Sequence, residues 1–227
     1  MRGDESRVSP ADLSALDGQH QQWETSFSEK PEMFGPAASA PAQWAAAAFQ
    51  REQNTKLLEL GPGQGRDTLF FAANGFQVTA VDYSQAAIDA IAARAKALGP
   101  GGSVKAMRHD LRVRLPFESE VFDACYSHML YCMALATTEL ERVSQEVWRV
   151  LKPGGLNVYT VRHTGDAHYG KGIHRGEDMY EVGGFIVHFF TREKVYHLAR
   201  GYEVVAIDEF EEGGLPRKLL RVTLRKP

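Results

Sequence analysis

The sequence predicts an α/β protein in which a mostly parallel sheet carries helices on both faces. Between residues 56 and 161, short apolar runs alternate with segments of helical periodicity, as in parallel strands joined by helices. Near the carboxyl terminus, two apolar runs follow each other with no helix between them, which predicts an antiparallel hairpin. The 227 residues, 44% of them hydrophobic, suit one domain.

The elements follow in a regular order along the chain. Pro41 suits a first helical turn, Gly75 closes the first helix after the glycines, and Ser84 and Gly99 bound the next one. Thr138 and Glu141 form a capping box for a later helix. We expect strands within 56–60, 77–82, 103–111, 121–129, 156–161, 202–210 and 219–226, and helices within 66–74, 84–98, 138–151 and 191–200.

These elements divide the chain into a tail and one domain. Residues 1–19 are polar with little to bury, and we expect a disordered tail there. Residues 20–227 form the domain. Its parts are a helical cover over 20–50, a cofactor-binding core over 56–161, a lid-like insert over 162–190, and a helix with the hairpin over 191–227.

Composition excludes several kinds of partner and location. The formal net charge of −3, with 26 basic and 29 acidic residues, gives no field built for nucleic acid or an anionic membrane. The two cysteines are too few for a disulfide scaffold or a four-cysteine zinc site. The chain shows no apolar signal segment at its start and no apolar run of about 20 residues. We therefore expect a cytoplasmic protein with neither nucleic acid nor membrane as partner.

The main binding signal lies in residues 57–84. Gly61, Gly63 and Gly65 follow the first predicted strand, where they allow a tight turn and bring backbone N–H groups close to a ligand. Asp82 ends the second strand, where a carboxylate can accept hydrogen bonds from two ribose hydroxyls. A ligand with a ribose and an anionic end fits this pattern. NAD, FAD and S-adenosylmethionine (SAM) all qualify.

The spacing of the loop separates these cofactors. A dinucleotide fingerprint G-x-G-x-x-G starting at Gly61 would need its third glycine where Arg66 stands. The loop reads E-x-G-x-G-x-G from Glu59 to Gly65. An acid two residues before the first glycine has no use beside a pyrophosphate, but it can hold the α-ammonium of a methionine moiety. The order of Glu59, three glycines and Asp82 therefore indicates SAM.

At this point the sequence resembles the class I SAM-dependent methyltransferases, over residues 56–161 and the hairpin. Five segments carry the resemblance in the family's order, namely ELGPGQG (59–65), VTAVDYS (78–84), HDL (109–111), FDACYS (122–127) and VLKPGGLNVYTV (150–161). The resemblance implies a Rossmann-like, doubly wound sheet of seven strands with the last strand antiparallel. It implies cofactor contacts from Glu59, Gly61, Gly63, Gly65, Asp82, Tyr83, Asp110, Leu111 and Ser127, with Asp110 and Leu111 near the adenine.

Within that superfamily, residues 63–84 are most similar to the tellurite-resistance and thiopurine methyltransferases. Those enzymes act on small molecules with chalcogen or sulfur nucleophiles. The two cysteines make the arsenite-methylating branch a poor match, since its metalloid site needs three or more thiols. We therefore expect a methyltransferase whose acceptor is a small molecule, with a thiol or chalcogen species as one candidate.

The segment SHMLYCMAL after the fourth strand offers the candidate catalytic residues. His128 and Tyr131 stand where the family places the transferring methyl group. A hydroxyl or amine acceptor usually needs a general base, for which His128 is the best candidate. A thiolate needs only positioning in a slot of low dielectric constant. His128 could equally be a hydrogen-bonded structural histidine.

Two other segments could line the acceptor pocket. Residues 162–190 are long for a connection, rich in Gly and His, and suit a lid. Large apolar residues before the first strand either pack in the core or form a pocket wall, and Arg66 and Arg175 could hold an anion or pair locally. The candidate substrate-binding residues are Arg66, Trp23, Phe34, His168, Tyr169 and His174.

These observations support a SAM-dependent methyltransferase, acting as a monomer or homodimer, with no metal. One alternative is methylation of oxygen, nitrogen or carbon with a histidine base, from His128 or from the insert. Another is a SAM-binding regulatory domain without catalysis. The sequence does not name the acceptor atom.

Overall fold

The central element of the fold is a seven-stranded sheet. The computed structural model describes residues 10–96, 103–213 and 217–227. The strand order is β3-β2-β1-β4-β5-β10-β9, and only β10 runs antiparallel to its neighbours. This confirms the predicted fold class and the hairpin. The strands are β1 (Lys56–Leu60), β2 (Gln77–Asp82), β3 (Val104–Arg108), β4 (Phe122–His128), β5 (Leu151–Arg162), β9 (Glu203–Glu212) and β10 (Arg217–Arg225).

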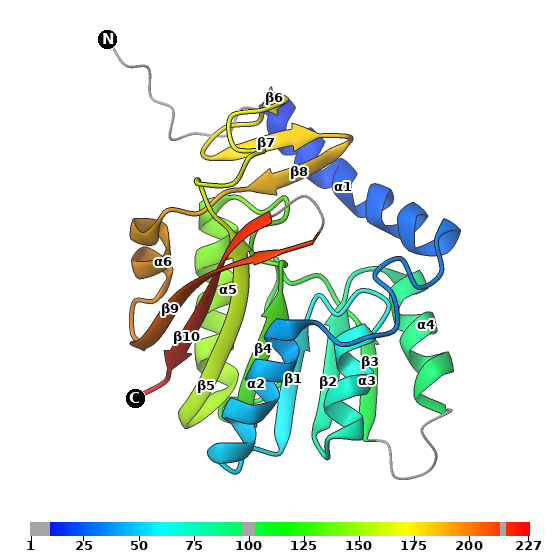
Figure 1. Cartoon of the computed structure of the whole chain (residues 1–227), viewed down its shortest axis with the longest axis vertical. Helices are drawn as coiled ribbons and strands as arrows, with labels where there is room; N and C mark the ends of the chain where they lie inside the picture. Colours follow the sequence, from blue (N-terminus) through cyan, green and yellow to red (C-terminus); the bar gives the residue numbers. More distant parts are fainter. Residues whose placement is uncertain (1–9, 97–102, 214–216) are drawn as a thin grey trace.

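Helices cover both faces of this sheet (Figure 1). The five helices that do so are α2 (Ala40–Arg51), α3 (Arg66–Ala73), α4 (Gln85–Ala95), α5 (Thr137–Val150) and α6 (Arg192–Leu198). On one face, Phe49, Phe71 and Ile91 from α2, α3 and α4 share a core with the strands. On the other face, α5 and α6 enclose a larger apolar core. Both faces of β1 are therefore buried, which explains why leucines occupy successive positions of this strand.

A second layer lies beyond the edge at which the parallel strands end (Figure 1). It consists of α1 (Pro10–Glu29) and a small antiparallel sheet of β6 (Ile173–His174), β7 (Met179–Val182) and β8 (Phe185–His188). Leu16 of α1 packs on Met179 and Ile186 of this sheet. Gln19 adds two hydrogen bonds, to the carbonyl oxygen of Gly184 and from the N–H of Ile186. We call α1 and β6–β8 together the cover layer.

Two predictions for these segments need correction. Residues 10–19 are helical, so the expectation of a disordered tail is wrong for them, and residues 1–9 lie outside the described residues. The polar composition predicted disorder because only one narrow side of this helix is buried, and most of its residues are therefore polar. The predicted helical cover over 20–50 is also divided, because α2 packs against the sheet and α1 alone reaches across the strand ends.

The insert over 162–190 is a folded sheet that is anchored to the domain. Buried His188 contacts Lys194 of α6, and its Nε2 lies 3.5 Å from a carboxylate oxygen of Glu177. Glu177 in turn accepts a 2.9 Å hydrogen bond from the N–H of Thr137 at the start of α5. Burial and the Lys194 charge lower the pKa of His188 to about 3, which keeps the ring neutral.

The helix ends confirm one predicted cap and correct another. Ser84 caps α4 by accepting from the N–H of Ala87. The capping box predicted at Thr138 and Glu141 is wrong, because the N-cap of α5 is Ala136, two residues earlier, and Glu139 accepts from the N–H of Ala136. The proposed stop at Gly99 lies outside the described residues.

Candidate functional site

A cavity of about 430 Å³ lies between the carboxyl ends of the strands and the cover layer. This volume is in the range of small-molecule sites. One side consists of the glycine loop and the ends of β1, β2 and β4, and the other of apolar side chains from the cover layer. Among the predicted site residues, those that line the cavity are Trp23, Phe34, Glu59, Gly61, Gly63, Arg66, Asp82, Tyr83, Leu111, His128 and His168.

Backbone geometry requires glycine at two positions of the loop after β1. Gly61 has φ of +64°, and an added Cβ would lie 2.8 Å from Leu130 Cδ1. Gly65 has φ of +83°, and its Cβ would lie 2.5 Å from Ile91 Cγ1. The loop is thus wedged between the segment after β4 and helix α4. Gly65 does not line the cavity but sets the start of α3.

Asp82 connects the ends of β1 and β2. Its carboxylate accepts hydrogen bonds from the N–H of Gly63 at 3.1 Å and of Ser84 at 3.0 Å. Burial raises the pKa of Asp82 to about 6 in spite of these donors. The acid therefore fixes the glycine loop directly, and it faces the cavity.

Glu59 is a buried acid without its full set of hydrogen bonds. The residue is 2% exposed and lines the cavity, and its Oε2 has no hydrogen-bond partner among the described residues. Burial, with the nearby Asp67 charge second, raises the pKa of Glu59 to about 8. A cation in the cavity would offset the free-energy cost of burying the ionised carboxylate, since a buried carboxylate is stable only when it is paired.

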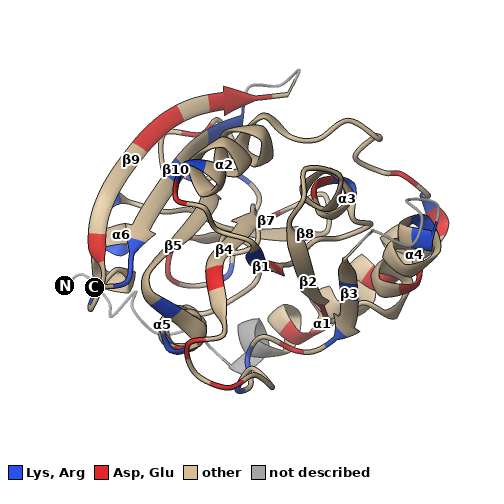
Figure 2. Ribbon diagram, turned by 90° about the horizontal axis from the view of Figure 1, so that it is seen from below, with Lys and Arg blue, Asp and Glu red and all other residues tan. Residues whose placement is uncertain are grey.

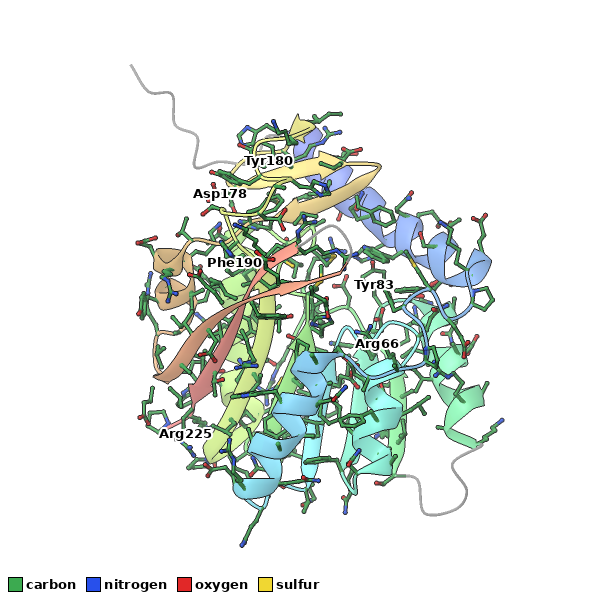
Figure 3. All side chains as sticks on the ribbon, in the orientation of Figure 1. Arg66, Tyr83, Asp178, Tyr180, Phe190 and Arg225 are labelled. Carbon is green, nitrogen blue, oxygen red and sulfur yellow. The ribbon has the colours of Figure 1, made fainter. Side chains whose placement is uncertain are left out.

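The glycine loop also holds the carboxyl end of α1. The Gln64 amide donates to the carbonyl oxygens of Phe27 and Lys30 and accepts from the N–H of Met33. Arg66 donates to the carbonyl oxygen of Phe34 and pairs with Asp67. Figure 3 shows Arg66 near the start of α3, below the level of α1. The predicted local pairing of Arg66 and its place in the cavity are thus both present.

His20 extends this contact further along α1. Its ring stacks on Tyr83 with centroids 4.2 Å apart and planes tilted by 7°. Both residues line the cavity, so α1 closes over the end of β2. Burial lowers the pKa of His20.

Protein atoms face both ring nitrogens of His128. Nδ1 lies 2.8 Å from Thr160 Oγ1, and Nε2 lies 3.3 Å from Glu212 Oε2. The next residue, Met129, has φ of +58°, which is uncommon for a side chain of this kind. This turn after β4 lies against the glycine loop through Leu130.

Six predicted site residues lie outside the cavity lining. Tyr131 is 1% exposed and stacks on Tyr159 in the core, and burial raises its pKa well above the usual value. Ser127 is fully buried within β4. The Asp110 carboxylate is held by Arg112, whose hydrogen bonds lower the pKa of Asp110 although burial opposes this.

The remaining predicted residues belong to the small sheet and the loop before it. The Tyr169 hydroxyl donates to Asp178, and the exposed His174 contacts the carbonyl oxygen of Glu177. Figure 3 shows Asp178 beside the small sheet, at its left in this view. His168 alone among the insert histidines reaches the cavity. Arg175, the other candidate anion binder, pairs with Glu181.

The structure adds lining residues beyond the predicted site residues. Phe185 and Phe189 from the insert and Phe27 from α1 make the cover side aromatic. Arg162 lines it too, although Asp166 already binds its guanidinium. Glu212, at the end of β9, lies beside His128. Glu212 belongs to the predicted hairpin, and only the strand order brings it to the site.

The described part of the chain contains no group of three His, Cys, Asp or Glu side chains arranged to hold a metal. It also contains no helix long and apolar enough to cross a bilayer.

Comparison with known proteins assigns the core. Residues 57–155 match the family model described as a methyltransferase domain, and this range contains both the glycine loop and the turn after β4. The matched residues form a SAM-dependent methyltransferase domain. Its cofactor is therefore SAM.

Solved structures share the fold of this methyltransferase at low sequence identity. The 1,6-didemethyltoxoflavin N1-methyltransferase of Burkholderia thailandensis has a TM-score of 0.71 and 20% identity, over 97% of this chain and 91% of that one. The [4+2]-cyclase SpnF has a TM-score of 0.70 and 19% identity, over 94% of this chain and 96% of that one. TehB of Haemophilus influenzae has a TM-score of 0.66 and 16% identity, over 90% of this chain and 67% of that one. At such identities these likenesses concern the fold alone.

The residues of the methyltransferase cavity suit SAM chemically. An ammonium group beside Glu59 would satisfy the carboxylate oxygen that has no hydrogen-bond partner among the described residues. Gly61 and Gly63, both with left-handed backbone, line the cavity and carry no side chain there. Asp82, at the neighbouring strand end, offers carboxylate oxygens at the same edge of the sheet.

Proposed function

We propose that this methyltransferase transfers the SAM methyl group to a neutral small molecule with an apolar, aromatic body. The observation that carries the proposal is the single cavity that runs from Glu59 and Asp82 to the aromatic side chains of the cover layer. A cofactor and an acceptor bound in one cavity can be held in line, which is the main requirement of a methyl displacement.

We assign the two sides of the cavity to the two reactants. On the cofactor side, Glu59 takes the ammonium, the glycine loop takes the methionine chain, and Asp82 takes the ribose. On the cover side, Trp23 contacts Phe27 and Phe185 at centroid distances of 5.3 and 4.7 Å. These rings form a surface on which a flat apolar body can stack.

A neutral acceptor is favoured over a thiolate or chalcogen anion. Of the four arginines that line the cavity, three have a carboxylate partner: Arg66 pairs with Asp67, Arg162 pairs with Asp166, and Arg217 lies 4.0 Å from Glu212. The fourth, Arg94 of α4, donates to the carbonyl oxygen of Gln64 in the glycine loop. The Arg162 pair is largely buried, with side-chain exposures of 8% and 1%, so its charge is already compensated. A free anionic nucleophile would find little uncompensated positive charge there.

The direct test is a panel of acceptors assayed for S-adenosylhomocysteine (SAH) formation. Aromatic amines, N-heterocycles, phenols, aromatic thiols, selenite and tellurite are each supplied with SAM. We expect turnover with at least one neutral aromatic class and little with selenite or tellurite. Turnover restricted to the chalcogen anions would overturn the neutral acceptor. SAM binding without turnover on any acceptor would favour the non-catalytic regulatory domain.

A further inference from the structure

Glu212 is the carboxylate that the C-terminal hairpin brings to the cavity. It ends β9, at the far edge of the sheet, and its side chain is 25% exposed. Figure 2 shows the acidic residues of β9 spread along the outer edge of the molecule. Glu212 differs from them because it lines the cavity and lies 3.3 Å from His128.

The surroundings of His128 leave no ring lone pair facing the cavity. A bare lone pair on Nε2 would be repelled by the carboxylate oxygen 3.3 Å away, so the tautomer with the hydrogen on Nε2 is favoured beside Glu212. Nδ1 is within hydrogen-bond distance of Thr160 Oγ1, which also accepts from the N–H of Met129. In either protonation state, both ring nitrogens of His128 therefore face protein atoms and neither is open to an acceptor. The direct proton acceptor must be another group.

Glu212 is ionised and has an oxygen to spare. The contact from His128 is the largest cause that lowers its pKa, and the charges of Arg66 and Arg217 add to this effect. Arg217 Nη1 lies 4.0 Å from Oε2. His128, Arg66 and Arg217 are the basic side chains that face the carboxylate. Its Oε1 makes no ion pair within the described part of the chain.

We propose that Glu212 is the acceptor-facing carboxylate of the site and that the acceptor atom is a neutral nitrogen, with His128 as a positioning residue. This inference rests on the proposed function, and it names the nucleophile that the function left open.

The charges of the reaction explain why nitrogen fits and a thiolate does not. The nitrogen lone pair forms the N–CH3 bond while the CH3–S bond breaks and its electron pair stays on sulfur. The product is neutral SAH and an N-methylated cation, so positive charge moves from sulfur to nitrogen. A carboxylate beside the nitrogen stabilises that developing charge. An N–H proton then passes to Glu212 and, through its exposed side, to water.

An anionic nucleophile would meet the opposite situation. A thiolate or selenide loses its negative charge in the same step, so Glu212 would repel the reactant and stabilise nothing in the transition state. A carboxylate at this position would then slow the reaction. The sign of its effect therefore distinguishes the two acceptor classes.

The experiment compares Glu212→Gln, which removes the charge and keeps the shape, with Glu211→Gln as the matched control. Glu211 is the neighbouring acid, exposed, and directed to the other side of β9 because strand side chains alternate. We expect Glu212→Gln to lower kcat for aniline-type and heterocyclic amines by about 10²-fold, the scale of losing one electrostatic contact to a transition state. Glu211→Gln should leave kcat unchanged.

Three further measurements separate this role from a structural one. SAH affinity of Glu212→Gln should equal that of the wild type, and Glu212→Asp should recover part of the amine rate. The rate with thiophenol should stay the same or rise in Glu212→Gln. The double variant His128→Ala with Glu212→Gln should be no slower than Glu212→Gln alone, since His128 acts through Glu212.

A binding measurement decides the case even without turnover. With SAH bound, benzylammonium should bind the wild type more tightly than Glu212→Gln, and benzyl alcohol should bind both equally. Equal benzylammonium binding, an unchanged amine rate, or an equal loss with amines and thiophenol would overturn the role of Glu212. Absence of methyl transfer together with the expected binding difference would overturn the proposed function and leave the carboxylate assignment standing.

Discussion

The two sides of the cavity are built in different ways. The cofactor side comes from consecutive strand ends within residues 57–84, and its geometry depends on backbone and on two buried acids. The cover side comes from α1, the insert and the hairpin, which lie far apart in the sequence and meet through side chains. Gln19, for example, contacts Gly184 across the cover layer.

This difference separates what a short motif can encode from what it cannot. Binding a cofactor through the backbone of a loop, and its ribose through a carboxylate, requires glycines and an acid at fixed positions. Local spacing in the sequence is enough to provide them. Recognition of an acceptor needs a shape made by several segments, and its residues can vary as long as the segments still pack. We therefore expect changes on the cofactor side to affect SAM binding, and changes on the cover side to affect the acceptor.

The largest expected effect is on the cofactor side. Asp82→Ala removes the acceptor for the N–H groups of Gly63 and Ser84 together with the proposed ribose contact. We expect SAM binding to weaken by about 1.5–3 kcal/mol, the scale of hydrogen bonds to a charged group. Calorimetry checks this result, and an unchanged affinity would remove the ribose assignment.

The second prediction concerns the pH dependence of SAM binding. Burial raises the pKa of Glu59 to about 8, so the free protein holds a proton there at pH 7. An ammonium beside Glu59 requires the ionised form, and binding must release that proton. Affinity should therefore rise between pH 6 and 8 by up to about tenfold per pH unit. Calorimetry in buffers of different ionisation enthalpy measures the released proton.

The variant Glu59→Gln is the control for this prediction. It should bind SAM more weakly at pH 8 and show no proton release. The raised pKa also means that the cofactor-free protein loses stability as pH rises from the usual value of 4.5 through 8, because the folded state keeps its proton longer than the unfolded chain. Glu59→Gln should flatten this slope, and an unchanged slope would contradict the assignment.

The third prediction tests the cover side. Trp23→Ala removes an aromatic surface that contacts Phe27 and Phe185. We expect the KM for the acceptor to rise about 5- to 100-fold, corresponding to about 1–3 kcal/mol of lost burial. SAH affinity should stay unchanged. Trp148→Ala is the matched control, because Trp148 is 40% exposed on α5 and does not line the cavity.

The smallest effect should appear in hydrogen exchange. SAH should slow exchange mainly in the glycine loop, and addition of an acceptor should extend protection to α1 and to β7 and β8. Exchange in α6, which packs with α5 on one face of the seven-stranded sheet, should not change. Protection confined to residues 57–127 after both additions would mean that the cover layer is only structural.

Sequence alone predicted the residues of the glycine loop and the two acids that line the cavity, because their requirements are local. Gly61 and Gly65 need left-handed backbone and space, and Asp82 needs only to end the second strand. Strand and helix periodicity predicted the sheet and the hairpin for the same reason. It failed at residues 10–19, where a mostly polar helix is held by tertiary contacts that no local pattern reports.

The acceptor side was decided only by the tertiary structure. The sequence predicted His128 as a candidate general base from its position at the end of the fourth strand. Thr160 and Glu212 come from other strands, and they contact both of its ring nitrogens. Tyr131, three residues later, turns into the core. Whether a side chain faces a cavity or the interior depends on the packing of segments distant in sequence, and spacing along one segment carries no information about it.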